Sequence, residues 1–158
     1  MLRINQSIGK KVTVGLFGYT GKELLSDPRL IFTSVTNEIQ MIGPDLTINH
    51  DEKLILNMQY VWRLDSRVFL TNIGPVGDIN TQGGFAEVIY SPKGDMSKWY
   101  LTGLFNWVDS DLNEIDYGSA TLHAGYLLRR NLRLVSEYTY QFSGNSYGKV
   151  NVGFVSAF

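Results

Sequence analysis

A strict alternation of apolar with mostly polar side chains runs from Lys53 to Leu64. The apolar positions are Leu54, Leu56, Met58, Tyr60, Trp62 and Leu64. A period of two places successive side chains on opposite sides of an extended chain, whereas side chains on one face of a helix repeat about every 3.6 residues. The segment therefore predicts a β-strand with one apolar face.

The same period recurs along most of the chain. Strands are predicted near residues 11–19, 83–91, 99–107 and 120–128, and less regular ones near 1–7, 36–48, 132–142 and 150–158. Within 36–48, Gly43-Pro44 predicts a β-bulge that resets the phase, because proline removes a ladder donor. Short polar turns alternate with longer loops, which are expected at 20–35, 65–82, 109–117 and 143–149. The pattern predicts an all-β, up-and-down antiparallel barrel of eight or nine strands, in one domain over 1–158 with no second domain.

The composition agrees with this class of fold. Of the 158 residues, 44% are hydrophobic, 18% are charged and 13% are aromatic, and 16 are glycine, a mixture typical of strands and turns. The net charge of −1 provides no excess positive potential, so we do not expect nucleic acid as a partner. The absence of cysteine excludes disulfides, thiolate metal sites and a cysteine nucleophile.

The sequence leaves one class of membrane protein open. It contains no run of about 18 apolar residues, so no membrane helix is expected. A barrel strand crosses a membrane with only about 9–11 residues, of which every second one is apolar. Residues 1–5 do not form a signal peptide, which leaves a cytosolic chain, a processed chain or a fragment.

Alternation alone fits both a soluble lipocalin-like barrel, apolar inside, and a membrane barrel, apolar outside. Aromatic residues near strand ends favour the membrane barrel, whose outward band is flanked by two aromatic girdles. The candidate girdle residues are Tyr60, Trp62, Trp99, Trp107, Tyr138 and Phe158.

The last eight residues run Asn-Val-Gly-Phe-Val-Ser-Ala-Phe. This segment resembles the C-terminal assembly signal of bacterial outer-membrane β-barrel proteins, with Asn151, Gly153, Phe154 and Phe158 as the matching residues, although Ser156 replaces the usual hydrophobic residue. A looser, porin-like resemblance in strand spacing extends over 36–158. The resemblance implies the outer membrane of a Gram-negative type bacterium, contact with its lipid, and insertion by the barrel-assembly machinery.

Strand number and charge bear on how such a barrel is built. Short turns are rich in Lys and Arg and the longer segments in Asp and Glu, which favours two chemically different ends. Eight strands close by themselves, whereas a ninth at 1–7 breaks the usual even count and indicates the C-terminal part of a larger barrel. About eight strands leave a filled interior, and about sixteen leave an aqueous channel.

Charged residues are expected on the inward face among many amides and hydroxyls. The candidate lumen-lining residues are Arg63, Glu87, His123, Arg133 and Glu137. In a wide barrel such charges select solutes, and in a narrow one they pair with each other. We therefore expect passive diffusion of small hydrophilic solutes, with the 65–82 loop as the constriction. The alternatives are a structural barrel that anchors or sheaths an envelope partner or forms an oligomer, and a soluble ligand-binding barrel.

Signs of other chemistry are weak. Residues 109–113 match the first ligand positions of a calcium loop, but Glu114 and Ala120 replace its glycine and its bidentate glutamate. The two histidines, His50 and His123, form no triad, and neither a nucleophile elbow nor a nucleotide-binding loop occurs. No enzymatic activity, cofactor or metal is expected.

Overall fold

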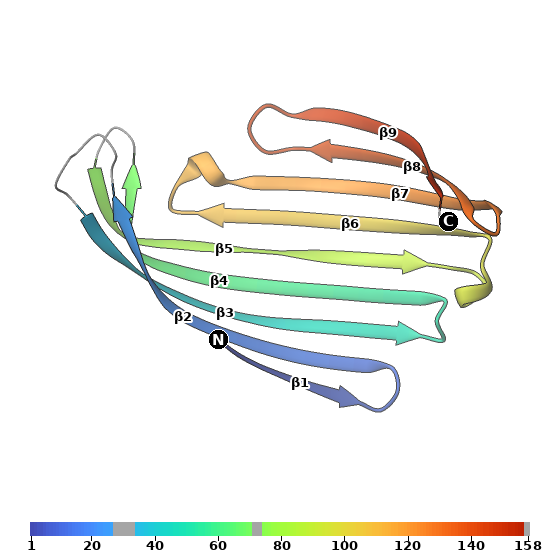
Figure 1. Ribbon diagram of the computed structural model, residues 1–158, viewed down its shortest axis with the longest axis horizontal. Coiled ribbons are helices and arrows are strands. Elements are labelled where there is room, and N and C mark those ends of the chain that lie inside the picture. The colour runs from blue at the N-terminus through green and yellow to red at the C-terminus, as the bar shows by residue number, and fades with distance from the viewer. Residues whose placement is uncertain (27–33, 71–73, 157–158) are drawn as a thin grey trace.

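The computed structural model describes residues 1–26, 34–70 and 74–156. They form one antiparallel sheet in which nine strands follow one another in chain order (Figure 1). The strands are β1 (Leu2–Ile8), β2 (Val12–Ser26), β3 (Ser34–His50), β4 (Leu54–Leu70), β5 (Gly74–Tyr90), β6 (Trp99–Ser110), β7 (Tyr117–Arg129), β8 (Leu132–Gln141) and β9 (Tyr147–Ser156). Two short 3-10 helices, η1 (Gly94–Met96) and η2 (Asn113–Ile115), lie in the connections before β6 and β7. The predicted all-β, up-and-down antiparallel arrangement is confirmed.

The prediction of long loops at 20–35 and 65–82 is wrong. β2 extends to Ser26 and β3 begins at Ser34, while β4 extends to Leu70 and β5 begins at Gly74. These extensions carry polar residues on both faces, so the alternation of apolar residues ends although backbone pairing continues. The pairs Lys22↔Glu38 and Arg67↔Gly77 lie within these ladders. The expected constriction at 65–82 is therefore a strand hairpin, of which residues 71–73 lie outside the described residues.

The predicted bulge at Gly43-Pro44 is also wrong. The register of β2 with β3 runs unbroken through Phe17↔Gly43 and Leu16↔Pro44. β3 and β4 pair at Ile42↔Trp62 and again, in the same register, at Asp45↔Gln59. A proline fits in a strand where its missing N–H is not needed by the ladder.

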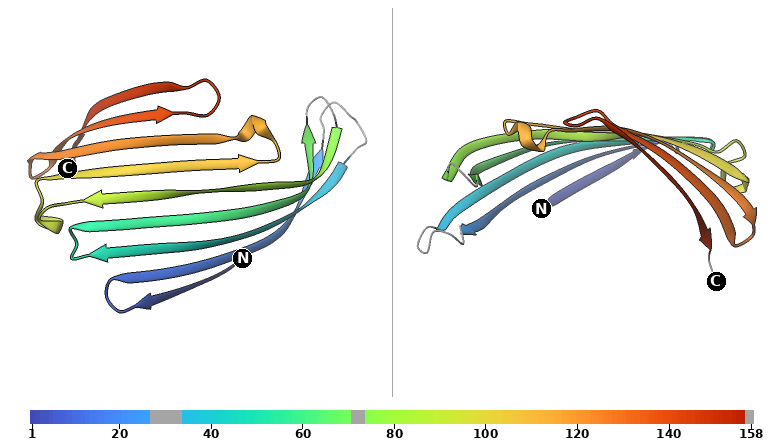
Figure 2. Two further views of the ribbon diagram at one scale, coloured as in Figure 1. Left: turned by 180° about the vertical axis from the view of Figure 1, so that it is seen from behind. Right: turned by 90° about the horizontal axis from the view of Figure 1, so that it is seen from above.

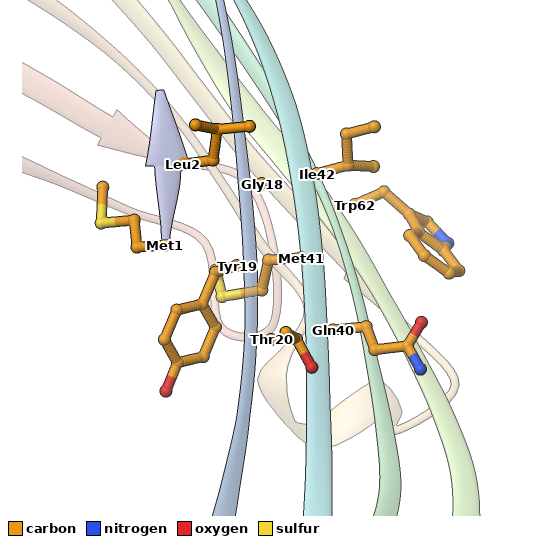
Figure 3. A pocket seen from close by; sticks show the side chains of 9 residues that line it. All are labelled: Met1, Leu2, Gly18, Tyr19, Thr20, Gln40, Met41, Ile42 and Trp62. Carbon is orange, nitrogen blue, oxygen red and sulfur yellow. The ribbon is translucent and has the colours of Figure 1, made fainter. Parts of the chain in front are cut away.

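The register divides all strand residues between two faces. The apolar face is the one that carries Leu54, Met58 and Trp62 of β4, and the polar face carries Asn57, Gln59 and Arg63. Figure 3 shows this separation, with Ile42 and Trp62 on one side of the ribbons and Tyr19 and Met41 on the other. Nearly all exposed large apolar side chains within the strands belong to the apolar face; the exceptions are Tyr19, Tyr117, Tyr147 and Val155.

The apolar face does not form a core. Met58 is 43% exposed and Leu122 is 58% exposed. Among the described residues, the buried large apolar side chains are Ile39 and Ile79, and both lie on the polar face. Since side chains converge on the inner side of a curved sheet, this burial identifies the polar face as the concave side of the arch seen in Figure 2.

The sheet has two open edges. Within the described residues β1 pairs with β2 alone and β9 pairs with β8 alone, and the two edges lie at opposite sides of the sheet (Figure 1). We call the end of the sheet at which β2, β4, β6 and β8 finish the loop side, and the opposite end the turn side. Because β1 and β9 both run toward the turn side, pairing them directly would be parallel.

Candidate functional site

Aromatic side chains gather at both margins of the apolar face. On the turn side, the rings of Tyr90 and Trp99 meet edge to face with centroids 5.9 Å apart. On the loop side, the ring centroid of Phe105 lies 5.9 Å from that of Trp107 and 5.8 Å from that of Phe142. Trp99 and Trp107 belong to the same strand and are separated by about 27 Å along it. The apolar band of β6 therefore has an aromatic residue at each end.

The other girdle candidates are distributed unequally. Tyr60 shares the cross-strand row of Trp107, and Trp62 lies one row further toward the loop side. Tyr138 lies in the row of Leu122 and Val150, away from the strand ends. Phe158 lies outside the described residues.

Beyond this margin the same face becomes polar. The Tyr60 hydroxyl donates to the Gln82 side chain (2.9 Å), whose amide donates to Asp109 (2.8 Å). Lys22 and Glu38 form an ion pair further out. Side chains with an apolar body and a polar tip suit a boundary between an apolar and an aqueous region.

All five predicted lumen-lining residues lie on the polar face, but they do not form one cluster. Glu87 belongs to a row that crosses all nine strands, namely Ser7, Thr13, Thr47, Asn57, Glu87, Leu104, Thr121, Thr139 and Lys149. Within it, Thr47 donates to Asn57 (3.0 Å) and Asn57 donates to Glu87 (2.8 Å). These polar side chains thus form hydrogen bonds with their neighbours on adjacent strands.

Arg63 belongs to a loop-side cluster that the sequence did not predict. Its guanidinium donates two hydrogen bonds to Asp65 (2.6 and 2.7 Å), and Asn37 donates a third (2.8 Å). Asp65 is only 4% exposed and stands between Ile39 and Ile79 in the register.

The surroundings of Asp65 act on its charge in opposite directions. Burial alone would raise the pKa of the carboxyl, but the hydrogen bonds from Arg63 and Asn37 and the charge of Arg63 hold this pKa below its ordinary value. The cluster therefore holds an ionised carboxylate in a buried position.

His123, Arg133 and Glu137 belong to a second cluster, nearer the turn side. The Tyr100 hydroxyl lies 3.0 Å from Nε2 of His123, and Nδ1 of His123 lies 3.7 Å from Glu137. Asn151 donates to the other oxygen of Glu137 (3.1 Å). Arg133 sits over the Tyr100 ring, 5.1 Å from its centroid. Tyr100 and Asn151 were not among the predicted lumen residues.

An ion pair on the polar face connects the edge strand β1 to the rest of the sheet. Arg3 of β1 forms an ion pair with Asp45 of β3 (3.1 Å), which crosses over β2. It does so above Gly15, where a Cβ would collide with the Asp45 carboxylate. The glycine leaves room for this bridge.

The C-terminal motif and the calcium-like segment take part in sheet contacts. Asn151 and Gly153 face the polar side, and Phe154 faces the apolar side with 68% exposure. Asp111 accepts the backbone N–H of Asn80 (2.8 Å), and Asp116 accepts that of Ser110 (2.9 Å). Within the described part of the chain, no three His, Asp or Glu residues come together as a metal site.

A hollow near the start of β1 draws residues from both faces, including Leu2, Tyr19 and Trp62 (Figure 3). It lies at the open edge of the sheet and encloses no set of convergent polar groups. None of the helices in the described ranges is long and apolar enough to cross a membrane. Comparisons of the chain with protein families, curated proteins and solved structures find no match.

Proposed function

We propose that this sheet is part of the wall of a β-barrel in the outer membrane of a Gram-negative type bacterium. Its apolar face contacts lipid, and its polar face lines an aqueous path for passive diffusion of small hydrophilic solutes. The observation that carries the proposal is the exposure of the apolar face across all nine strands.

Three physical arguments support the lipid contact. Soluble monomers rarely expose a continuous apolar patch larger than a few hundred Å². The stretch from Trp99 to Trp107 has the length of about 9–11 residues that a tilted barrel strand needs, with aromatic residues at both ends. A soluble barrel with an apolar interior would bury Met58 and Leu122, which are exposed.

The open edges support a barrel wider than nine strands. An unpaired edge in hydrocarbon leaves backbone N–H and C=O groups unsatisfied at a cost of several kcal/mol each. Since β1 and β9 run in the same direction, antiparallel closure requires an odd number of further strands between them. Polar side chains such as Asn57 and Glu87 also form hydrogen bonds with each other along the proposed wall.

Cysteine labelling tests the orientation, because the native chain contains no cysteine. Met58→Cys and Gln59→Cys are matched neighbours on opposite faces. In lipid, we expect a membrane-impermeant maleimide to label Gln59→Cys and to spare Met58→Cys. Equal labelling of the two positions, or the reverse order, would overturn the proposal.

Conductance tests the aqueous path. We expect stepwise currents when the purified protein is added to a planar bilayer. A membrane that stays sealed while the cysteine pattern holds would contradict diffusion and favour a structural barrel that anchors or sheaths an envelope partner. In either case the barrel-assembly machinery would be needed for insertion in the cell.

A further inference from the structure

We propose that the cluster of Tyr100, His123, Arg133, Glu137 and Asn151, here called the histidine cluster, sets a pH-dependent charge preference of the path. The inference rests on the proposed function. His123 is the member that changes charge, and the preference of the path for anions increases when the pH falls.

Four strands contribute to the histidine cluster. Tyr100 comes from β6, His123 from β7, Arg133 and Glu137 from β8, and Asn151 from β9. The rings of Tyr100 and His123 stack with centroids 5.5 Å apart. Directly opposite Tyr100 stands Gly125, where a Cβ would collide with the tyrosine ring. The glycine thus lets the ring lie flat against the sheet, with its hydroxyl at His123.

Few charged or titratable side chains lie near His123 on the polar face. On β6 its neighbours on the same face are Tyr100, Thr102 and Leu104, and on β7 they are Thr121 and Gly125. On β8 they are Val135, Glu137 and Thr139, with Arg133 further along, and on β9 Asn151 follows Glu137, with Lys149 and Gly153 beside it on the same face. The titratable or charged side chains among these are Tyr100, Arg133, Glu137 and Lys149, and Lys149 lies two strands away from His123.

The charge balance follows directly. With a neutral imidazole, Arg133 and Glu137 cancel, and the histidine cluster has no net charge. Histidine is the side-chain type whose ordinary charge change lies between pH 8 and pH 5. A proton on the His123 imidazole gives the cluster a net charge of +1. Protonation does not break the contacts, because a tyrosine hydroxyl can donate to Nε2 or accept from it.

The histidine cluster differs from the loop-side cluster in its access to water. The His123 side chain is 25% exposed and that of Glu137 is 37% exposed, whereas that of Asp65 is 6% exposed. A charge that appears at a half-exposed wall position acts on ions that pass it. The opposite charges of Arg63 and Asp65 cancel each other, and this pair does not change its charge between pH 8 and pH 5.

Reversal potentials in a KCl gradient at pH 7.5 and pH 5.5 test this inference. In water, one positive unit charge about 5 Å from a passing ion favours an anion and disfavours a cation by about fourfold each, which corresponds to about a sixteenfold change in the ratio of anion to cation permeability. We expect an increase of this order on acidification of the native protein. His123→Gln, which retains hydrogen bonding without a titratable charge, should be invariant with pH.

His50→Gln is the matched control, because it removes the other histidine from an exposed turn-side position. It should retain the pH response. A reversal potential that is independent of pH in the native protein, or a pH response that persists in His123→Gln, overturns this inference alone. A sealed membrane overturns the proposed function and the inference with it.

A second measurement does not depend on conductance. In His50→Gln, imidazole labelling with nitrogen-15 leaves His123 as the one labelled side chain. We expect its signals to change between pH 8 and pH 5 in lipid-embedded protein, and Glu137→Gln should alter this change. Signals that stay constant over the range overturn the inference.

Discussion

Met58 and Gln59 are neighbours in β4, yet they belong to two differently organised surfaces. Met58 lies on the apolar face among Leu46 and Ala86, and 43% of it is exposed. Gln59 is half-buried on the polar face, in the row of Asp45. The polar face satisfies its groups within the sheet, whereas the apolar face depends on an apolar environment from outside. A sheet with this asymmetry needs a second apolar surface against its exposed apolar face to be stable.

The largest expected effect comes from a charge on the apolar face. Leu122→Arg places a guanidinium in the middle of the proposed lipid contact, and we expect a loss of about 2–4 kcal/mol in the free energy of unfolding from lipid. Thr121→Arg is the matched change on the polar face and should cost less than about 1 kcal/mol. Urea unfolding in lipid vesicles measures both. Similar losses for the two variants would remove the distinction between the faces.

The loop-side cluster should be the most sensitive place on the polar face. Asp65→Ala leaves Arg63 and Asn37 without their acceptor, and we expect a loss of about 2 kcal/mol in the same unfolding assay. Asp95→Ala, in η1 on the surface, should stay within about 0.5 kcal/mol of the native protein. If the Asp65 variant also unfolds like the native protein, the cluster does not stabilise the strand extensions.

Two glycines sharpen the comparison between the faces. Gly125→Ala on the polar face forces the Tyr100 ring to move, and we expect a loss of about 1–2 kcal/mol, which Tyr100→Ala should relieve. At Gly103 on the apolar face nothing lies within 4 Å of an added Cβ. Gly103→Ala should therefore be neutral, or stabilise slightly through the unfolded chain. Thermal unfolding of Gly125→Ala, of Gly103→Ala and of the double variant with Tyr100→Ala checks this, and equal losses at both glycines would contradict the close contact between Gly125 and the Tyr100 ring.

The smallest expected effect is a dependence on acid pH. Because the pKa of Asp65 is lower in the folded protein than in the unfolded chain, its contribution is complete above the ordinary carboxyl pKa of about 3.9. The contribution is lost as the pH falls from there through the lowered folded pKa. Between pH 5 and pH 2, Asp65→Asn should lose less stability than the native protein. Identical acid profiles would show that Asp65 is not the group concerned.

The sequence predicts the faces well because a period of two is a local signal. Leu54, Met58 and Trp62 needed no knowledge of neighbouring strands to be assigned to one face. The extensions of β2 to β5 were missed because Lys22 and Arg67 interrupt that signal, while backbone pairing continues without it.

The clusters were predicted only in part, for a related reason. Arg63 and Asp65 lie two residues apart on one face of β4, although the sequence predicts a loop from residue 65, and Asn37 joins them through the register of β3 with β4. Tyr100 meets His123 through the register of β6 with β7. Register depends on turn geometry, which a pattern of apolar residues does not specify. Alternation assigned Arg63 and His123 to the inward face, but it did not identify their partners.

The native tryptophans provide the most direct measurement of the central claim. Trp62, Trp99 and Trp107, the three tryptophans of the chain, all lie on the apolar face near its margins. In vesicles whose acyl chains carry bromine, we predict strong quenching of their fluorescence, greater for bromine near the headgroups than near the bilayer centre. Fluorescence that brominated lipid leaves unchanged and aqueous acrylamide quenches fully would contradict the lipid contact.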